Sequence, residues 1–208
     1  MSSNPPPSPS TVLTLTSGSV IVFEGLDKAG KSTQLDRMKQ AIDHTGTTFA
    51  HMPSGFGGFT AGVYAVLENK DTTPSHALAR QLAHLACHSE SMPALVEKAR
   101  HGALVLDRWW WSTLAYGWYG KGETDLGIDE PTFRNLIEAI WSPIRADLVF
   151  LFLHAYEADS NNVDGVAEGY QQIADQSPAT VVRVPAMEED DTHGFLVAEL
   201  NRLGVVAG

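Results

Sequence analysis

The sequence predicts an α/β fold in which a parallel β-sheet carries helices on both of its faces. Short apolar runs rich in β-branched residues alternate along the chain with helical patterns, which is typical of parallel sheets. A glycine-rich loop joins the first apolar run to the first helical pattern. With 208 residues, 43% of them hydrophobic, the chain is long enough for one domain with a substantial core.

The predicted elements follow one another in a regular order. The expected strands are 20–24, 48–51, 103–107, 147–153 and 180–184. The expected helices are 31–44, 59–69, 75–100, 110–118, 130–141, 163–175 and 189–202. Pro74 suits the start of the longest helix, and Pro93 is expected to kink or break it.

The N-terminal end is expected to be a disordered and dispensable tail over residues 1–17. Its first ten residues include four prolines and four serines, a composition that buries too little apolar surface to offset the entropy of ordering. The folded domain is therefore expected to span residues 18–208.

Residues 25–33 read Gly-Leu-Asp-Lys-Ala-Gly-Lys-Ser-Thr and follow the first predicted strand directly. Gly25 and Gly30 allow backbone N–H groups to surround phosphate oxygens, Lys31 adds a positive charge, and Ser32 offers a hydroxyl to Mg²⁺. The following helix directs its N-terminus at the same phosphate. The pattern predicts a phosphate-binding loop, and the competing interpretation is a chance glycine turn.

A second candidate site lies at the end of the predicted strand 103–107. Ligands of open α/β sheets bind outside the carboxyl ends of the strands. Asp107 is placed there to hold Mg²⁺ directly or through water. Arg108 can form two parallel hydrogen bonds with a phosphate group. The alternative is that Asp107 and Arg108 form a surface ion pair.

The composition argues against several classes of protein. The formal net charge is −11, with 14 basic and 25 acidic residues, so a protein that grips duplex nucleic acid is disfavoured and small phosphorylated molecules are the expected partners. A single cysteine, Cys87, excludes a disulfide framework. Apolar runs are too short to span a membrane and the N-terminus lacks a signal-peptide pattern, so a cytoplasmic protein is expected.

Three stretches of the chain together resemble the thymidylate kinase family. They are 23–34, with an aspartate inside the glycine loop, 107–116, with its Asp-Arg-Trp triplet, and the weaker match 166–174. The resemblance covers residues 18–203. It implies a three-layer P-loop kinase fold with a five-stranded parallel sheet, a homodimer packed through long helices, and transfer of the ATP γ-phosphate to a nucleoside monophosphate.

The resemblance also implies roles for matched positions. Asp27 would hold the sugar hydroxyl of the acceptor, Arg108 would hold the acceptor phosphate, and Ser32 and Asp107 would hold Mg²⁺. The implied ATP-binding residues are Gly25, Lys28, Ala29, Gly30, Lys31, Ser32 and Thr33. The implied acceptor-binding residues are Asp27, Pro53, His84, His88, Arg108, Trp109 and Tyr116. Lys31, Lys28 and Arg108 are the expected catalytic residues.

The chain departs from the family pattern in the region of the flexible lid. No lysine or arginine lies between Arg145 and Arg183, and the lid segment is short and acidic. Some thymidylate kinases carry the catalytic cation in the P-loop instead, at the position that Lys28 occupies here. The competing interpretation is that Lys28 is an ordinary solvated loop residue.

The expected base site also departs from the family. His84 lies where these kinases often place a stacking phenylalanine, and His88 lies where they often place an arginine that binds a base oxygen. The two histidines are four residues apart, so they share one helix face. A histidine can stack on a base and hydrogen-bond to it. The alternative is that both are ordinary surface or core-edge histidines.

The sequence therefore predicts a nucleoside monophosphate kinase that uses ATP and Mg²⁺ and acts on dTMP or a modified deoxyuridylate. Two other functions stay open: a kinase that acts on a modified base in DNA, and a nucleotide-binding module without catalysis. The excess of acidic residues argues against DNA as the acceptor, because contacts with DNA phosphates require cationic side chains. The P-loop lysine and serine, with Asp107 and Arg108, weigh against a non-catalytic module.

Overall fold

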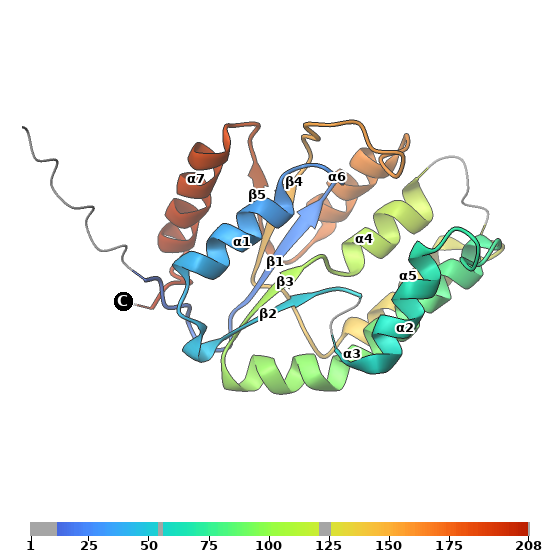
Figure 1. Cartoon of the computed structure of the whole chain (residues 1–208), viewed down its shortest axis with the longest axis horizontal. Helices are drawn as coiled ribbons and strands as arrows, with labels where there is room; N and C mark the ends of the chain where they lie inside the picture. Colours follow the sequence, from blue (N-terminus) through green and yellow to red (C-terminus); the bar gives the residue numbers. More distant parts are fainter. Residues whose placement is uncertain (1–11, 54–55, 121–125, 208) are drawn as a thin grey trace, which may run out of the picture.

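Five strands form one parallel sheet in the order β2-β3-β1-β4-β5 (Figure 1). The structure is a computed structural model that describes residues 12–53, 56–120 and 126–207. The strands are β1 (Val20–Gly25), β2 (Thr47–His51), β3 (Ala103–Asp107), β4 (Leu148–Phe152) and β5 (Thr180–Val184). The predicted α/β class is confirmed, and each predicted strand end lies within one residue of the observed one.

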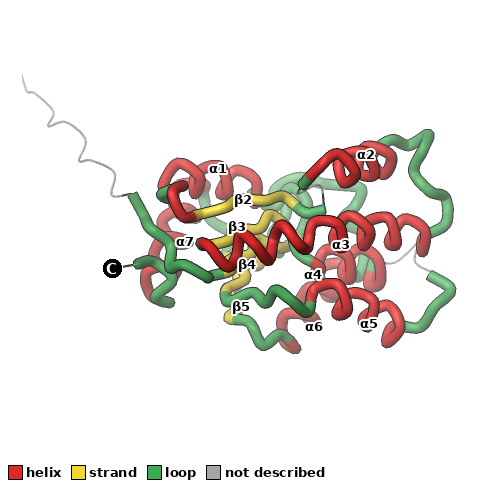
Figure 2. The backbone as a smooth tube through the Cα atoms, turned by 90° about the horizontal axis from the view of Figure 1, so that it is seen from below, coloured by secondary structure: helices red, strands yellow, loops and turns green. Residues whose placement is uncertain are grey.

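Helices cover both faces of the sheet, as Figures 1 and 2 show. They are α1 (Lys31–Ala41), α2 (Gly57–Glu68), α3 (Ala77–His101), α4 (Trp110–Leu114), α5 (Glu130–Trp141), α6 (Val166–Gln176) and α7 (Glu189–Arg202). The pair α1 and α7 packs together, while α3, α4 and α6 form the other layer, with α2 and α5 against α3. Across the described residues, every helix is too short or too polar to cross a bilayer.

Three helix predictions need correction. The first helix ends at Ala41 rather than at 44, because Ile42 is extended and forms a bridge with Leu13. The sixth begins at 166 rather than 163, after Gly165 in a left-handed conformation. The expected break at Pro93 does not occur, because α3 runs unbroken over 25 residues and is anchored by buried residues on both sides of the proline.

The central strand β1 positions the glycine loop. All six of its residues are buried, because it pairs with β3 on one side and β4 on the other. At its end, the Leu26 N–H donates to the Phe152 carbonyl oxygen at 2.9 Å. A Cβ atom at Gly25 would lie 1.9 Å from that oxygen, and Gly25 has a φ of +131°. Only glycine fits there, so the loop begins at the carboxyl edge of the sheet.

The predicted disordered tail is wrong for residues 12–17; residues 1–11 lie outside the described part of the chain. Leu13 exchanges backbone hydrogen bonds of 2.8 Å with Ala41 and Asp43, and Leu15 forms an antiparallel bridge with Val206. The Leu15 side chain is 5% exposed. The sequence pattern missed this segment because its partners lie on α1 and near the C-terminus, far away in the chain.

Replacing Leu15 with alanine is therefore expected to destabilise the protein. Removal of a buried leucine side chain costs about 2–3 kcal/mol in free energy of unfolding at a peripheral core position. Urea denaturation followed by circular dichroism measures the change. Val12→Ala is the matched control, because Val12 is 59% exposed. Equal stability of the two variants would show that the segment is dispensable after all.

Candidate active site

A cavity of about 1480 Å³ lies at the carboxyl edge of the sheet. It is bordered by the glycine loop, the ends of β2 and β3, and one face each of α2 and α3. The structure brings these predicted site residues together in its wall: Asp27, Lys28, Ala29, Gly30, Lys31, Ser32, Thr33, Pro53, His84, His88, Asp107, Arg108, Trp109 and Tyr116. Gly25 contributes its carbonyl oxygen, which accepts hydrogen bonds from Lys31 and Arg108.

The glycine loop has the conformation that its sequence predicts. Gly30 caps α1 with a φ of 84°, and Lys31 opens the helix. The Lys31 ammonium group is buried and donates to the carbonyl oxygens of Gly25, at 3.1 Å, and Leu26. Burial, assisted by the nearby charge of Arg108, lowers the pKa of Lys31 to about 8. Ser32 is exposed at the same helix N-terminus, so its hydroxyl is free to meet a ligand.

Two non-glycine residues of the described chain have a left-handed backbone, and both line the cavity. Lys28 has a φ of 58° and Arg108 a φ of 69°. Such conformations cost about 1–3 kcal/mol each and cluster at ligand-binding sites. The described lysine and arginine residues in the cavity wall are Lys28, Lys31 and Arg108.

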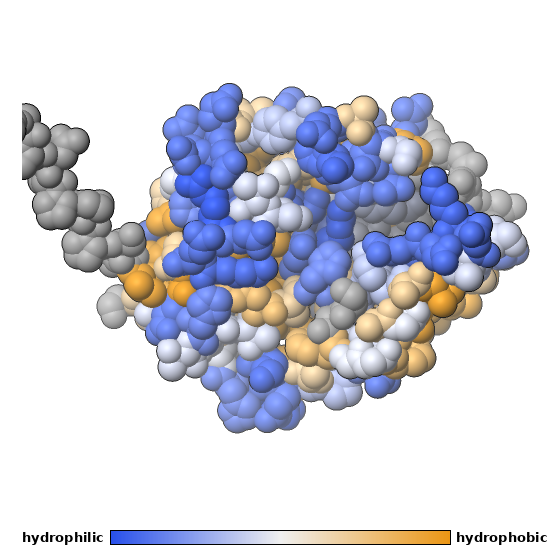
Figure 3. All heavy atoms as spheres, viewed as in Figure 1, coloured by the Kyte–Doolittle hydropathy of each residue, from blue (hydrophilic) through white to orange (hydrophobic). Residues whose placement is uncertain are grey.

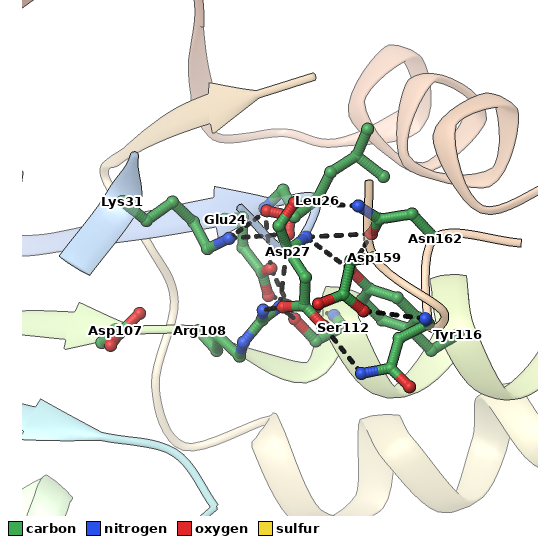
Figure 4. A network of polar contacts seen from close by, with 12 residues as sticks. Glu24, Leu26, Asp27, Lys31, Asp107, Arg108, Ser112, Tyr116, Asp159 and Asn162 are labelled. Atoms are coloured by element: carbon green, nitrogen blue, oxygen red, sulfur yellow. Dashed lines mark hydrogen bonds and ion pairs between the residues drawn. The ribbon is translucent and has the colours of Figure 1, made fainter. Parts of the chain in front are cut away.

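Arg108 lies at the centre of the polar network in Figure 4. Its guanidinium forms an ion pair with Asp27 and donates to the Ser112 hydroxyl at 2.9 Å and to the Gly25 carbonyl at 3.2 Å. It also lies 5.6 Å from the centre of the Tyr116 ring. Burial works against its charge, but the surrounding groups, Asp27 among them, raise the pKa of Arg108 above its usual value. The alternative interpretation, a surface ion pair of Arg108 with Asp107, does not hold: within the described residues Arg108 pairs with Asp27.

Glu24 is a site residue that the sequence analysis missed. It is fully buried, and its carboxylate accepts from the backbone N–H groups of Gly25, Trp109 and Ser112 and from the Ser112 and Tyr170 hydroxyls. Burial raises the pKa of Glu24, while the Arg108 charge and these hydrogen bonds favour the ionised form. The carboxylate thus ties the end of β1 to the turn that presents Arg108.

The segment that was expected to be the lid reaches the glycine loop through two asparagines that the sequence did not single out. The Asn162 side chain accepts the Asp27 N–H at 3.0 Å and donates to the Asp27 carbonyl at 2.8 Å. Tyr116 donates to the same Asn162 oxygen and accepts the Asp27 N–H, each at 3.0 Å. Asn161 donates to the Asp27 carboxylate at 3.1 Å. Figure 4 shows Asn162 among the residues of this network.

Replacing Asn162 with alanine is expected to loosen Asp27. The change removes both hydrogen bonds to the Asp27 peptide, so the free energy of unfolding should fall by about 1–2 kcal/mol. The KM of the acceptor should rise more than the KM of the donor, because Asp27 is the residue expected to hold the acceptor sugar. Thermal melting and two-substrate kinetics measure these effects. Asn161→Ala is the control, because Asn161 is exposed and makes one bond to Asp27.

Asp107 opens onto the cavity as expected, but it has a partner that the sequence did not reveal. The His51 Nδ1 lies 2.9 Å from its carboxylate. Burial acts in the opposite direction, but the His51 hydrogen bond and nearby positive groups lower the pKa of Asp107. The Asp107 side chain is 20% exposed, so an oxygen stays accessible. Carboxylate and hydroxyl oxygens suit Mg²⁺, which needs few protein ligands beside the phosphates, so Asp107 and Ser32 fit the ion.

One face of α3 forms another part of the cavity wall. Gln81, His84 and His88 all line the cavity, at the spacing of one helix face. Burial lowers the pKa of His84 to about 4, and burial together with His84 lowers the pKa of His88 to about 3. Both rings are therefore neutral near pH 7. Gln81 was missed because a glutamine on a helix has no distinctive pattern.

The neighbouring tryptophans have two different places: one lines the cavity, and another lies in the hydrophobic core. Trp109 is 6% exposed and lines the cavity, whereas Trp111 is fully buried. Trp109 contacts Trp110, Trp111 and Trp141 with ring centres 5.2–6.1 Å apart. Trp109 therefore connects the cavity wall to the packed tryptophans behind it.

A second cavity of about 260 Å³ adjoins the glycine loop on its other side. It lies between the loop and the segment that joins β5 to α7. Its lining includes Gly30, Thr33, His154, Tyr156 and Pro185. Its position next to the P-loop suits the nucleoside part of a phosphate donor.

Comparison with known proteins identifies relatives over most of the chain. Residues 23–184 match the family model described as thymidylate kinase. The thymidylate kinase of Bacillus velezensis is 36% identical over 197 residues, covering 84% of this chain and 91% of the relative. The thymidylate kinase of an Exiguobacterium species is 26% identical over 215 residues, covering 91% of this chain and 99% of the relative.

Solved structures share the fold. The crystal structure of thymidylate kinase from Ehrlichia chaffeensis has a TM-score of 0.69 at 21% identity, covering 88% of this chain and 98% of that chain. The thymidylate kinase structure from Candida albicans has a TM-score of 0.67 at 20% identity, covering 92% of this chain and 95% of that chain. The family match spans more than half of the chain and includes the glycine loop and Arg108. The chain therefore belongs to the thymidylate kinase family and is a phosphotransferase.

Proposed function

We propose that the protein transfers the γ-phosphate of ATP to dTMP or a closely related pyrimidine deoxynucleotide. The observation that carries the proposal is the joint placement of the P-loop Lys31 and the Asp27–Arg108 pair in the wall of one cavity. Phosphoryl transfer needs alignment and charge neutralisation more than covalent chemistry from the protein. The relatives that are thymidylate kinases support the same acceptor.

The donor and acceptor take opposite sides of the glycine loop in this proposal. Lys31 and the loop amides hold the donor phosphates, with the donor nucleoside in the smaller cavity. Arg108 holds the acceptor phosphate and Asp27 its sugar hydroxyl, so the acceptor base extends toward α3. Ser32 and Asp107 would hold Mg²⁺, and the ion would supply positive charge for phosphoryl transfer. Lys28 meets the charge that develops during transfer.

The test is ADP formation from ATP and Mg²⁺ with a panel of acceptors. The panel contains dTMP, dUMP, 5-hydroxymethyl-dUMP, dCMP, dAMP and dGMP. We expect the highest kcat/KM with dTMP or a 5-substituted dUMP, and little turnover with purines. No acceptor-dependent ADP with any pyrimidine would contradict the proposal. The net charge of −11 supports a free nucleotide over DNA as the acceptor.

We also propose a homodimer that packs through α2 and α3. Phe59, Val66 and Leu82 of these helices are 53%, 44% and 45% exposed. Figure 3 shows apolar residues at the lower right, over the same region. Light scattering should give about twice the 22.5 kDa mass of one chain, and a monomer at micromolar concentration would contradict the proposal. The cytoplasmic location stays a prediction from sequence.

A further inference from the structure

His88 has a hydrogen-bond partner that fixes the position of its proton. The Trp141 Nε1–H, at the end of α5, donates to His88 Nδ1 at 3.1 Å. The two ring centres lie 5.4 Å apart, with the ring planes at 75°. An indole nitrogen only donates, so Nδ1 must be the acceptor. The neutral imidazole therefore carries its proton on Nε2.

The surroundings of His88 keep the ring neutral and its hydrogen bond to Trp141 intact. The side chains of His88 and Trp141 are 2% and 3% exposed, so water competes poorly for their hydrogen bond. The pKa of His88, lowered to about 3 by burial, leaves the ring neutral near pH 7. Within the described chain, the His88 ring hydrogen-bonds to Trp141, and the ring also lines the large cavity. The unshared Nε2–H is then the hydrogen-bonding group that His88 can offer to a ligand.

We propose that Trp141 makes His88 a fixed hydrogen-bond donor that selects a pyrimidine presenting a carbonyl oxygen over one presenting an amino group. The inference rests on the proposed function, because it requires the acceptor base to extend toward α3. A thymine or uracil ring can present its 4-carbonyl to the Nε2–H. A cytosine ring presents a 4-amino group there, which leaves two donors facing each other without an acceptor. Trp141 acts through His88 and is a positioning residue.

The central experiment compares Trp141→Phe with wild type in kcat/KM for dTMP and dCMP. Without the indole donor, the imidazole can move its proton to Nδ1 and accept from an amino group. We expect the preference for dTMP over dCMP to fall by about tenfold, chiefly through faster turnover of dCMP. Trp110→Phe is the matched control, because Trp110 belongs to the same aromatic cluster and lies outside the cavity wall. It should keep the wild-type preference.

A second variant tests the same inference independently, in case Trp141→Phe does not fold. His88→Gln carries an amide that can present either an N–H or a carbonyl oxygen, so it should also lose the preference while it still turns over both acceptors. The melting temperature of each variant shows whether it is folded. An unchanged preference in both folded variants would overturn the inference.

Nuclear magnetic resonance tests the proton position without catalysis. Long-range ¹H–¹⁵N correlation spectra of the histidine-labelled full chain at pH 7, with His88→Gln for assignment, should show a neutral ring with its proton on Nε2. Trp141→Phe should shift this ring toward the other tautomer. A proton on Nδ1, or on both nitrogens, in wild type would overturn this inference but would leave the proposed function standing. A wild type that phosphorylates no pyrimidine monophosphate would instead overturn the proposed function, whatever the spectra show.

Discussion

Replacing Lys31 with alanine is expected to lower kcat/KM by about a thousandfold or more, since it removes a preorganised charge from a water-poor site. The Lys31 ammonium lies buried against the loop carbonyls, and loss of its charge should weaken ADP and ATP binding as well. Calorimetry measures nucleotide affinity, and a coupled ADP assay measures turnover. Lys39→Ala is the control, because Lys39 lies on the exposed side of the same helix and pairs with Asp36.

Lys28 should behave differently from Lys31. It is exposed and lines the cavity, so Lys28→Ala should keep nucleotide affinity within about threefold while kcat falls by about ten- to a hundredfold. The reason is that the sequence between Arg145 and Arg183 supplies no other cation. Wild-type kcat in Lys28→Ala would refute its catalytic role.

Lys31 also predicts a pH dependence of nucleotide binding. A lysine is charged below its pKa, and burial lowers the pKa of Lys31 to about 8 in the nucleotide-free protein. As the pH rises through 8, Lys31 loses its proton and ADP affinity should fall. The decrease between pH 7 and 9 should be absent in Lys31→Ala. An affinity that rises over this range in wild type would contradict the assignment.

Replacing Arg108 with alanine should lower both stability and activity. The change leaves the buried Glu24 and the partly buried Asp27 without their nearest cation, which costs about 3 kcal/mol in free energy of unfolding. It also removes the group proposed to hold the acceptor phosphate, so acceptor kcat/KM should fall by about a thousandfold. Denaturation in urea and steady-state kinetics measure the two losses.

A further variant separates charge from geometry at this position. Arg108→Lys keeps the positive charge but lacks the planar group that binds two oxygens at once. It should recover part of the stability while the acceptor KM stays raised. Arg37→Ala is the control for stability, because Arg37 pairs with exposed Glu189 and Asp190, and such surface pairs contribute under about 1 kcal/mol. An Arg108→Ala protein as stable as Arg37→Ala would show that the buried network does not depend on Arg108.

The sequence by itself determined the strands, the glycine loop and the Asp107–Arg108 turn. Each of these depends on local information. Buried parallel strands are continuous apolar runs, and the loop requires glycine at Gly25 and Gly30 because of its backbone conformation. Strand ends of a parallel sheet meet at one edge, so the sequence also predicted that these residues share a site. The cavity wall contains them together.

Only the tertiary structure decided which groups hold these residues in place. The bonds from Ser112 to Glu24, from Asn162 to Asp27 and from Trp141 to His88 join positions 88, 135 and 53 residues apart. Their partners are single polar residues in helices and loops, and such residues leave no periodic pattern in a sequence. The helix end at Ala41 and the backbone pairing of residues 13–16 were missed because the partners of these residues also lie far away in the chain. Side-chain hydrogen bonds between distant segments form only after the sheet has brought those segments together.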